Sequence, residues 1–239
     1  MSKITSPSTL NEQVEYNGTY FGDLTWLVSP ETGSKVSYAS ARKKIRSIAF
    51  HLNARGMAPG SKIAVAANNG ISSCLTILGI IYAGHIALPL NLVAGSKIIA
   101  YTLDHSETAL IFTANDCEKL ISEALSDFKK EVEIIKLDSQ LGPIWGKEAP
   151  NETFVKKENV SAEEIAVIMY TSGTTGNPKG VMLSHSNLLA AGRYISSGHE
   201  VDHKDTALCV LPIYHINGLC VTVMGTLASA STLVLPDRF

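Results

Sequence analysis

The sequence has no excess of positive charge and no closely spaced pair of cysteines. Its 239 residues include 20 Lys and Arg against 22 Asp and Glu, which gives a formal net charge of −2. Such a balance lacks the basic surface that nucleic acids attract, so we expect no nucleic-acid partner. The four cysteines, at positions 74, 117, 209 and 220, form no Cys-x-x-Cys motif. We expect buried, reduced thiols in a cytoplasmic protein.

The sequence also lacks an apolar run long enough to cross a membrane. Residues 1–11 are polar and show no apolar core of a signal peptide. The stretch Cys74–Leu90 is nearly free of charge, but two glycines, a histidine and a proline interrupt it. A span needs roughly 20 apolar residues. We therefore predict no membrane span here, but a buried helix over 72–83 and a short strand over 86–88.

What the sequence does contain is an alternation of strand-like and helix-like segments, in a chain that is 45% hydrophobic and 18% charged. Near-continuous apolar strands alternating with helices predict an α/β fold, with mostly parallel sheets and helices on both faces. The expected strands cover 62–67, 86–88, 109–113, 133–137, 165–170, 181–183, 207–211 and 231–235. The first expected helix begins after Ser37 and ends before Gly56. The other expected helices cover 72–83, 96–104, 116–128, 186–197 and 216–229.

The same patterns divide the chain into four parts. We expect an irregular segment over 1–36 and a first α/β subdomain over 37–137. A polar connector follows over 138–161, and a second α/β segment occupies 162–239. The last residue comes directly after an expected strand, so we expect this segment to be truncated.

The segment Tyr170–Met182 reads YTSGTTGNPKGVM and follows an expected buried strand. Glycines let successive backbone N–H groups face an anion, while hydroxyls add donors and Lys179 adds a positive charge. These are the components of a polyphosphate-binding loop, and a plain surface turn has no need of them. The loop is not a Walker A motif, where Gly-Lys-Ser/Thr opens a helix, because Pro178 precedes the lysine and a strand-like segment follows.

This segment resembles the phosphate-binding signature of the AMP-forming, adenylate-forming ligases. That superfamily includes acyl-CoA synthetases, firefly-type luciferases and the adenylation domains of peptide synthetases. Three further segments resemble other family motifs, namely Tyr82–Asn91 (YAGHIALPLN), Leu183–Leu188 (LSHSNL) and Leu211–Gly218 (LPIYHING). The resemblance runs from about residue 20 to the last residue, and it implies the N-terminal part of the family's large domain.

The resemblance implies a ligase that joins a carboxylic acid to ATP, giving an acyl-adenylate and pyrophosphate, and then forms a thioester with CoA. A carboxylate is already ionised at neutral pH, so this chemistry needs no general base. It needs positive charge and preorganised donors, because an anion must approach a polyanion.

The family motifs also imply roles for individual residues. The nucleotide-binding residues are Thr171, Ser172, Gly173, Thr174, Thr175, Gly176 and Lys179. Lys179 and His215 are the implied catalytic residues, and Tyr214 and His215 are the implied substrate-binding residues. Thr174 is the implied ligand of Mg²⁺.

Other motifs of the family are absent from the sequence. We find no Tyr-Gly-x-Thr-Glu motif, which would supply a magnesium-binding Glu, and no later Thr-Gly-Asp segment, which would supply an Asp for the ribose. The small domain that carries a further catalytic lysine is also missing. We therefore expect residues 1–239 alone to be inactive. We also expect self-association through an apolar surface, in keeping with a mean hydropathy of +0.13.

Three alternatives to an acyl-CoA synthetase follow from the sequence. The chain is also compatible with a peptide-synthetase adenylation domain, or with a non-catalytic nucleotide-binding fragment. A zinc hydrolase is suggested by His199-Glu-Val-Asp-His203, which matches His-Glu-x-x-His. That motif needs both histidines on one face of a helix, whereas here we expect a solvated loop between a helix and a strand.

Overall fold

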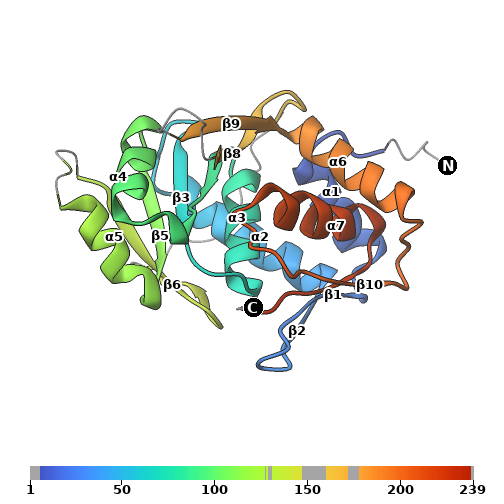
Figure 1. Ribbon diagram of the computed structural model, residues 1–239. Coiled ribbons are helices and arrows are strands. Elements are labelled where there is room, and N and C mark those ends of the chain that lie inside the picture. The colour runs from blue at the N-terminus through green and yellow to red at the C-terminus, as the bar shows by residue number, and fades with distance from the viewer. Residues whose placement is uncertain (1–5, 127, 129–130, 147–159, 172–177, 238–239) are drawn as a thin grey trace.

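The computed structural model describes residues 6–126, 128, 131–146, 160–171 and 178–237. These residues form two sheets with helices packed around and between them (Figure 1). The larger sheet has seven strands in the order β7-β6-β5-β3-β4-β8-β9. Its strands are β3 (Lys62–Ala66), β4 (Ile86–Pro89), β5 (Leu110–Ala114), β6 (Glu133–Asp138), β7 (Gly142–Pro143), β8 (Ile165–Thr171) and β9 (Lys179–Ser184).

The five inner strands of this sheet, from β6 to β8, run parallel, whereas β7 and β9 pair antiparallel at the two edges. The expected α/β fold with mostly parallel sheets is confirmed. Strand β3 shows why helices cover both faces. Ile63 and Val65 belong to one buried apolar cluster, and Ala64 and Ala66 belong to another. Successive side chains of a strand point to opposite faces, so β3 contributes to two cores.

Different helices fill the two cores. The cluster that contains Ile63 also contains side chains of α2 (Tyr38–Asn53) and α3 (Ile71–Tyr82). The cluster that contains Ala64 is built with α4 (Ser96–His105) and α5 (Glu118–Leu125). Short 3₁₀ turns, η1 (Leu92–Ala94) and η2 (Asn115–Cys117), precede α4 and α5. The connections from β3 to β4, from β4 to β5 and from β5 to β6 each carry a helix across one face of the sheet.

The smaller sheet joins the two ends of the described chain. Its strand order is β10-β11-β1-β2, with β1 parallel to β11. The strands are β1 (Thr25–Val28), β2 (Lys35–Ser37), β10 (Thr206–Leu208) and β11 (Thr232–Val234). Helix α2 contacts β1, β2 and α3. Around this sheet lie α1 (Leu10–Tyr20), α6 (His185–Gly198), a π-helical segment η3 (Asn217–Met224) and α7 (Gly225–Ser229).

The predicted helix after Ser37 and the predicted split of the apolar stretch are both confirmed. The Ser37 side chain accepts a hydrogen bond from the backbone N–H of Ser40 and caps α2. The stretch Cys74–Leu90 forms most of α3 and then β4, and every residue of α3 after Ile71 is buried. Among the residues that the structure describes, no helix is long and apolar enough to cross a membrane.

The N-terminal segment differs from the expectation of irregular structure. Residues 10–20 form α1, and Thr9 and Glu12 form a capping box at its start. The helix has no clean apolar face, because Asn11, Gln13 and Asn17 are among its buried residues. Asn17 donates to the backbone oxygen of Leu227 at 2.6 Å. Burial of polar side chains through such long-range bonds is why periodicity did not predict this helix.

Three other elements differ in extent. The helix expected over 116–128 consists of η2 followed by α5, and the helix expected over 216–229 is divided between η3 and α7. The strand expected over 207–211 is limited to β10. The division of the chain into parts at 37–137, 138–161 and 162–239 stays a prediction, because sheet order alone does not define domains.

Candidate functional site

The candidate site lies at the edge of the larger sheet where the parallel strands end. The connection after β3 leads to α3 on one face, whereas those after β4 and β5 lead to α4 and α5 on the other. Neighbouring loops therefore leave this edge in opposite directions. In open α/β sheets, ligands bind outside the carboxyl ends of strands at such a crevice.

The predicted phosphate-binding loop begins at this edge. Strands β8 and β9 form a hairpin in which Thr171 pairs with Lys179. The implied loop residues Ser172, Gly173, Thr174, Thr175 and Gly176 lie outside the described residues. Thr171 and Lys179 are described, and both are exposed. The two ends of the loop are thus held opposite each other where β8 leaves the sheet.

The base of this hairpin is packed against the rest of the fold. The Tyr170 hydroxyl lies 2.7 Å from Nδ1 of His105, at the end of α4. Burial raises the pKa of Tyr170 above its usual value of 10.0. Opposite Tyr170 stands Gly180, where an added Cβ would lie 3.1 Å from the Ile168 side chain and 3.3 Å from the Tyr170 ring. These contacts pack the described ends of the hairpin against the sheet and against α4.

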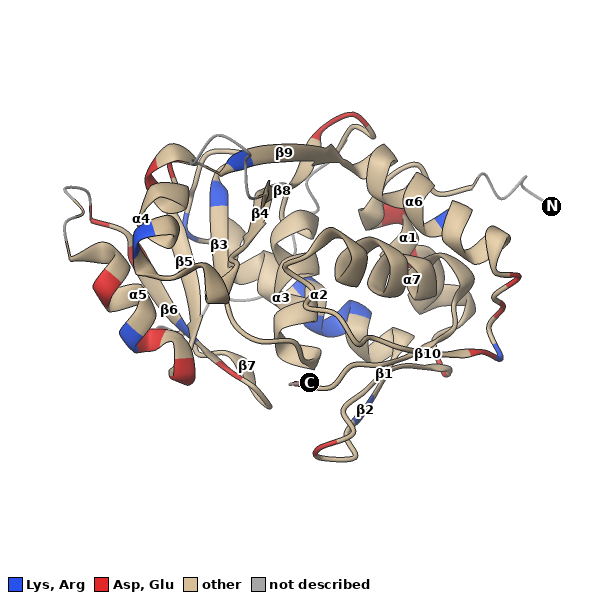
Figure 2. Ribbon diagram, viewed as in Figure 1, with Lys and Arg blue, Asp and Glu red and all other residues tan. Residues whose placement is uncertain are grey.

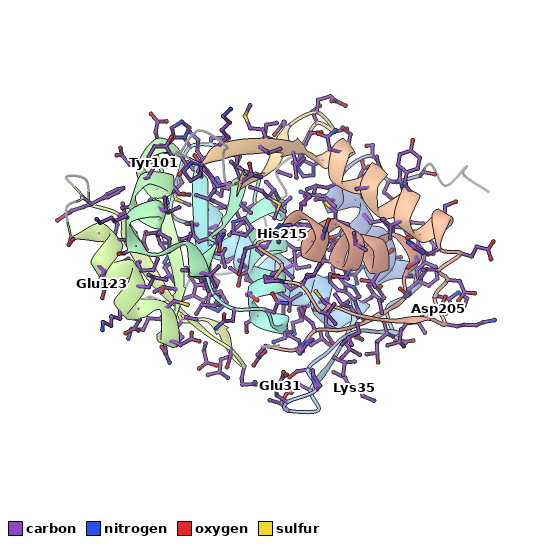
Figure 3. The ribbon with its side chains drawn as sticks, in the orientation of Figure 1. Glu31, Lys35, Tyr101, Glu123, Asp205 and His215 are labelled. Carbon is purple, nitrogen blue, oxygen red and sulfur yellow. The ribbon has the colours of Figure 1, made fainter. Side chains whose placement is uncertain are left out.

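Tyr214 and His215 lie on a second loop, between β10 and η3. The backbone N–H of His215 donates to the carbonyl of Pro212 at 2.9 Å. This turn is tight, because a Cβ added at Gly218 would collide with the same carbonyl. His215 is exposed, and Tyr214 is half-buried with a pKa raised by that burial. Figure 3 labels His215 near the middle of the molecule.

Asn69 attaches this second loop to the sheet edge. It lies between the end of β3 and the start of α3 and is only 8% exposed. Its Nδ2 donates to the carbonyl oxygen of Leu211 at 3.0 Å, and its Oδ1 accepts from the N–H of Ile213 at 2.7 Å. The two implied sites, one after β8 and one in the 211–215 turn, are therefore both anchored at the carboxyl edge. Sequence reasoning missed Asn69, although an asparagine between a strand and a helix is a typical capping residue.

A cavity of about 320 Å³ adjoins Asn69, but its chemistry does not suit a polyphosphate. Three carboxylates line it, those of Asp116, Asp138 and Asp237. The backbone N–H groups of Leu141 and Gln140 lower the pKa of Asp138, which keeps that group ionised. Negative charge repels phosphate, so we do not place ATP here. This cavity is lined by neither Lys179 nor the Tyr214–His215 pair.

The described part of the chain contains no candidate site for either Mg²⁺ or Zn²⁺. Within that part, no group of three or more His, Cys, Asp or Glu side chains is arranged to hold an ion. Thr174, the implied magnesium ligand, lies outside it. The described residues therefore offer no ligand set of their own for Mg²⁺, and we derive no step through one.

The helix required by the His-Glu-x-x-His motif is not formed. α6 ends at Gly198, so His199 is the residue that follows the helix, and Glu200 has a left-handed φ of 54°. His203 lies in the turn beyond and stacks against Phe21 at 6.3 Å. The two histidines are therefore not one turn apart on a helical face, and the zincin geometry is not reproduced.

Comparisons with known proteins identify the class. The family described as AMP-binding enzyme matches residues 14–239. The chain belongs to this family, as the resemblance of the loop predicted. It is 31% identical to a sulfoacetate–CoA ligase of Cupriavidus necator and 28% identical to a 2-succinylbenzoate–CoA ligase of Bacillus cereus. The matches cover 100% and 84% of this chain, respectively, but 48% and 39% of those relatives.

Solved structures agree on the fold. ATP-bound MatB from Rhodopseudomonas palustris superposes with a TM-score of 0.81 at 24% identity. A fatty acyl CoA synthetase of Mycobacterium tuberculosis superposes with a TM-score of 0.82 at 22% identity. These matches cover 98% and 97% of this chain, and 46% and 45% of the solved chains. The chain thus spans about half the length, or less, of the proteins it matches here, and corresponds to the N-terminal part of the CoA ligases in this family.

Proposed function

We propose that the chain acts, within a longer ligase, in the reaction of a carboxylic acid with ATP to give an acyl-adenylate and then an acyl-CoA. The observation that carries this proposal is the position of the β8–β9 hairpin. Its connecting loop starts at the carboxyl edge of the sheet, with Thr171 and Lys179 exposed at its base. Membership of the AMP-binding family supports the same assignment.

In this proposal the loop receives the phosphates of ATP. Thr171, Ser172, Gly173, Thr174, Thr175 and Gly176 supply donors or backbone freedom, as the sequence analysis implied. An oxygen of the acid's carboxylate bonds to the α-phosphorus, and the bond from that phosphorus to the bridging oxygen of pyrophosphate breaks. Pyrophosphate gains negative charge as it leaves, so the Lys179 ammonium stabilises the transition state more than the ground state.

Tyr214 and His215 are proposed to border the acid. The turn that carries them is fixed by Asn69 at the same edge of the sheet. The exposed His215 imidazole can donate a hydrogen bond to the reacting carboxylate, and the half-buried Tyr214 ring offers an apolar wall. No proton is removed from the acid, since its carboxylate is already ionised.

The remaining assignments are also proposals. Mg²⁺ enters as part of the MgATP substrate, with Thr174 as the proposed ligand. CoA is the proposed acceptor in the second half-reaction, rather than a carrier-protein thiol. A cytoplasmic location is supported by the four buried free cysteines, because reduced thiols are typical of that compartment. Self-association of residues 1–239 is proposed to involve exposed apolar side chains such as Val181, Met182 and Val210.

ATP–pyrophosphate exchange in the longer ligase tests the adenylation step. We expect Lys179→Ala to lower kcat by about 10²–10³-fold, as for the loss of a single transition-state donor, with a smaller change in KM for ATP. Lys204→Ala is the matched control, because that lysine is exposed in the turn after α6. A large rise in KM with unchanged kcat would show that Lys179 contributes only to nucleotide binding.

The acceptor and the requirement for the rest of the ligase need separate measurements. Adding CoA after adenylation should release a thioester, and release only with a carrier protein would favour the peptide-synthetase alternative. Residues 1–239 alone should not catalyse exchange. Positioning is worth roughly 7–11 kcal/mol, and the family's carboxylates for magnesium and ribose are absent from this sequence. Exchange by a monomer of this chain, above its own Lys179→Ala variant, would contradict that expectation.

A further inference from the structure

A second cavity, of about 290 Å³, lies away from the loops described above. Helices α2 and α3 form one side of it, and the segment from Gln140 to Trp145 forms the other. Helix α3 contacts β7, the short strand within this segment. Neither Thr171 nor Lys179, the described ends of the β8–β9 loop, lines the cavity, and no residue of the 211–215 turn does.

The lining of this cavity combines apolar and aromatic side chains with polar ones, namely those of Lys44, Ser47, His51, Ser72 and Gln140. Ile48 and Leu75 are buried in its floor, and Leu141 stands at its mouth with 80% of its surface exposed. The Trp145 indole stacks on the His51 ring, with ring centroids 4.4 Å apart and an interplanar angle of 8°. Its ring also meets Phe112 edge-on at 5.7 Å. Two aromatic contacts hold the indole in place, so an aromatic wall is formed in advance of any ligand.

The charge at the cavity is positive. Among the described residues that line it, Lys44 is the one with a formal charge, and none is an Asp or Glu. Lys44 belongs to a basic stretch of α2, visible in Figure 2, in which Arg42 and Arg46 both pair with Glu15. No ion pair among the described residues involves Lys44. Its ammonium is therefore available to an anion that enters the cavity.

A further cation, the Arg55 guanidinium, lies over the Trp145 ring. The Arg55 guanidinium lies 4.8 Å from the centroid of the Trp145 ring and is paired with Glu133 at 3.0 Å. This pair is internally neutralised, so it stiffens the wall without adding net charge. The ligand preference therefore rests on the Lys44 charge and on the shape of the apolar floor.

We propose that this cavity binds a small aromatic carboxylate, with the ring over the Ile48–Leu75 floor beside the stacked His51 and Trp145 rings, and the carboxylate at Lys44. Its volume lies near the lower end of the usual range for ligand pockets, roughly 300–1,000 Å³, which suits a molecule of one or two rings. Apolar and aromatic side chains together with a small number of polar groups that orient the ligand are the usual lining of such sites. The site is separate from the proposed substrate site, so its ligand would be an effector or a second bound acid.

Binding of phenylacetate to the full chain tests the proposal by tryptophan fluorescence and calorimetry. The chain has two tryptophans, and Trp26 is buried in the core with 1% exposure. The change in emission should therefore come from Trp145 and disappear in Trp145→Phe. Phenylacetamide, which has the same ring without the charge, should bind more weakly.

Matched lysine variants locate the carboxylate. Lys44→Ala should weaken phenylacetate binding about tenfold, in line with loss of a charge-assisted contact. Lys43→Ala should leave it unchanged, because Lys43 is the exposed neighbour on the same helix and does not line the cavity. Equal effects of the two variants, or absence of any binding, would overturn the proposal.

Variants of the other site keep the two proposals distinguishable. Lys179→Ala and His215→Ala should leave phenylacetate binding to this cavity intact, whatever they do to adenylation. Binding lost in His215→Ala but retained in Lys44→Ala would mean that the acid occupies the proposed substrate site. That result would overturn the present inference and support the proposed function.

Discussion

The two arms of the β8–β9 hairpin have nearly the same length but opposite surroundings. In β8, the four residues from Ala166 to Met169 are buried, between β4 on one side and β9 on the other. In β9, the four residues from Lys179 to Met182 are exposed at the edge of the sheet. One arm therefore fixes the connecting loop to the core, and the other presents its lysine to solvent. A loop that must hold an anion needs both properties.

The largest effect on the free energy of unfolding should appear when a methionine of one arm is replaced by alanine and compared with the same replacement in the other arm. Met169 in β8 is 3% exposed, whereas Met182 in β9 is 64% exposed. Met169→Ala should lower the free energy of unfolding by about 2–5 kcal/mol, because it leaves a cavity in the core. Met182→Ala should change it by less than about 0.5 kcal/mol. Chemical denaturation followed by circular dichroism measures both, and similar losses would show that β9 is covered in solution.

A smaller effect should come from the second loop at the same edge. Asn69→Ala leaves the buried N–H of Ile213 without this acceptor and removes one donor to the Leu211 carbonyl, which also accepts from the Cys209 thiol. The unpaired N–H should cost about 1–3 kcal/mol. Asn68 is the matched control, since its side chain donates to Asp116 at the surface. Asn68→Ala should therefore have little effect on the same unfolding measurement. Equal losses would mean that Asn69 does not fix the turn of Tyr214 and His215.

The smallest effect on stability should be that of Lys179→Ala. Lys179 is exposed, and no ion pair among the described residues includes it. Its removal should change the free energy of unfolding by less than about 0.5 kcal/mol, even though adenylation in the longer ligase falls sharply. A clear loss of stability would indicate that the ammonium stabilises the hairpin itself, and the kinetic result would then need to be corrected for unfolding.

The parts of the fold that the sequence predicted are those whose apolar pattern is local. Helix α2 has a capping serine and a regular apolar face, and β3 and α3 are near-continuous apolar segments. Helix α1 was missed because its buried side chains include amides whose partners lie far along the chain. Asn11 bonds to the carbonyl of Tyr82, and Asn17 bonds to that of Leu227. No window of sequence contains both members of such a pair.

Only part of the candidate site could be predicted from the sequence. The loop after β8 was predicted because its glycines, hydroxyls and lysine are adjacent in the sequence. The role of Asn69 was not predicted, because it depends on contact with residues more than 140 positions away. The cavity at Trp145 was missed for the same reason, since α2, α3 and the segment around β7 meet there only in the folded chain.

The pairing of β1 with β11 means that the smaller sheet cannot be completed until nearly the whole chain has been synthesised. Leu27 lies opposite Leu233, so about 200 residues must be made before β1 finds its parallel neighbour. At about 5–20 residues per second, a ribosome needs roughly 10–40 s for this interval. Trp26 and Leu27 are both fully buried in the finished fold. During this interval β11, the parallel neighbour of their strand, has not yet been made. We therefore expect the nascent chain to expose this apolar edge to chaperones until β11 has left the ribosome, whereas β3, β4 and β5 can assemble earlier.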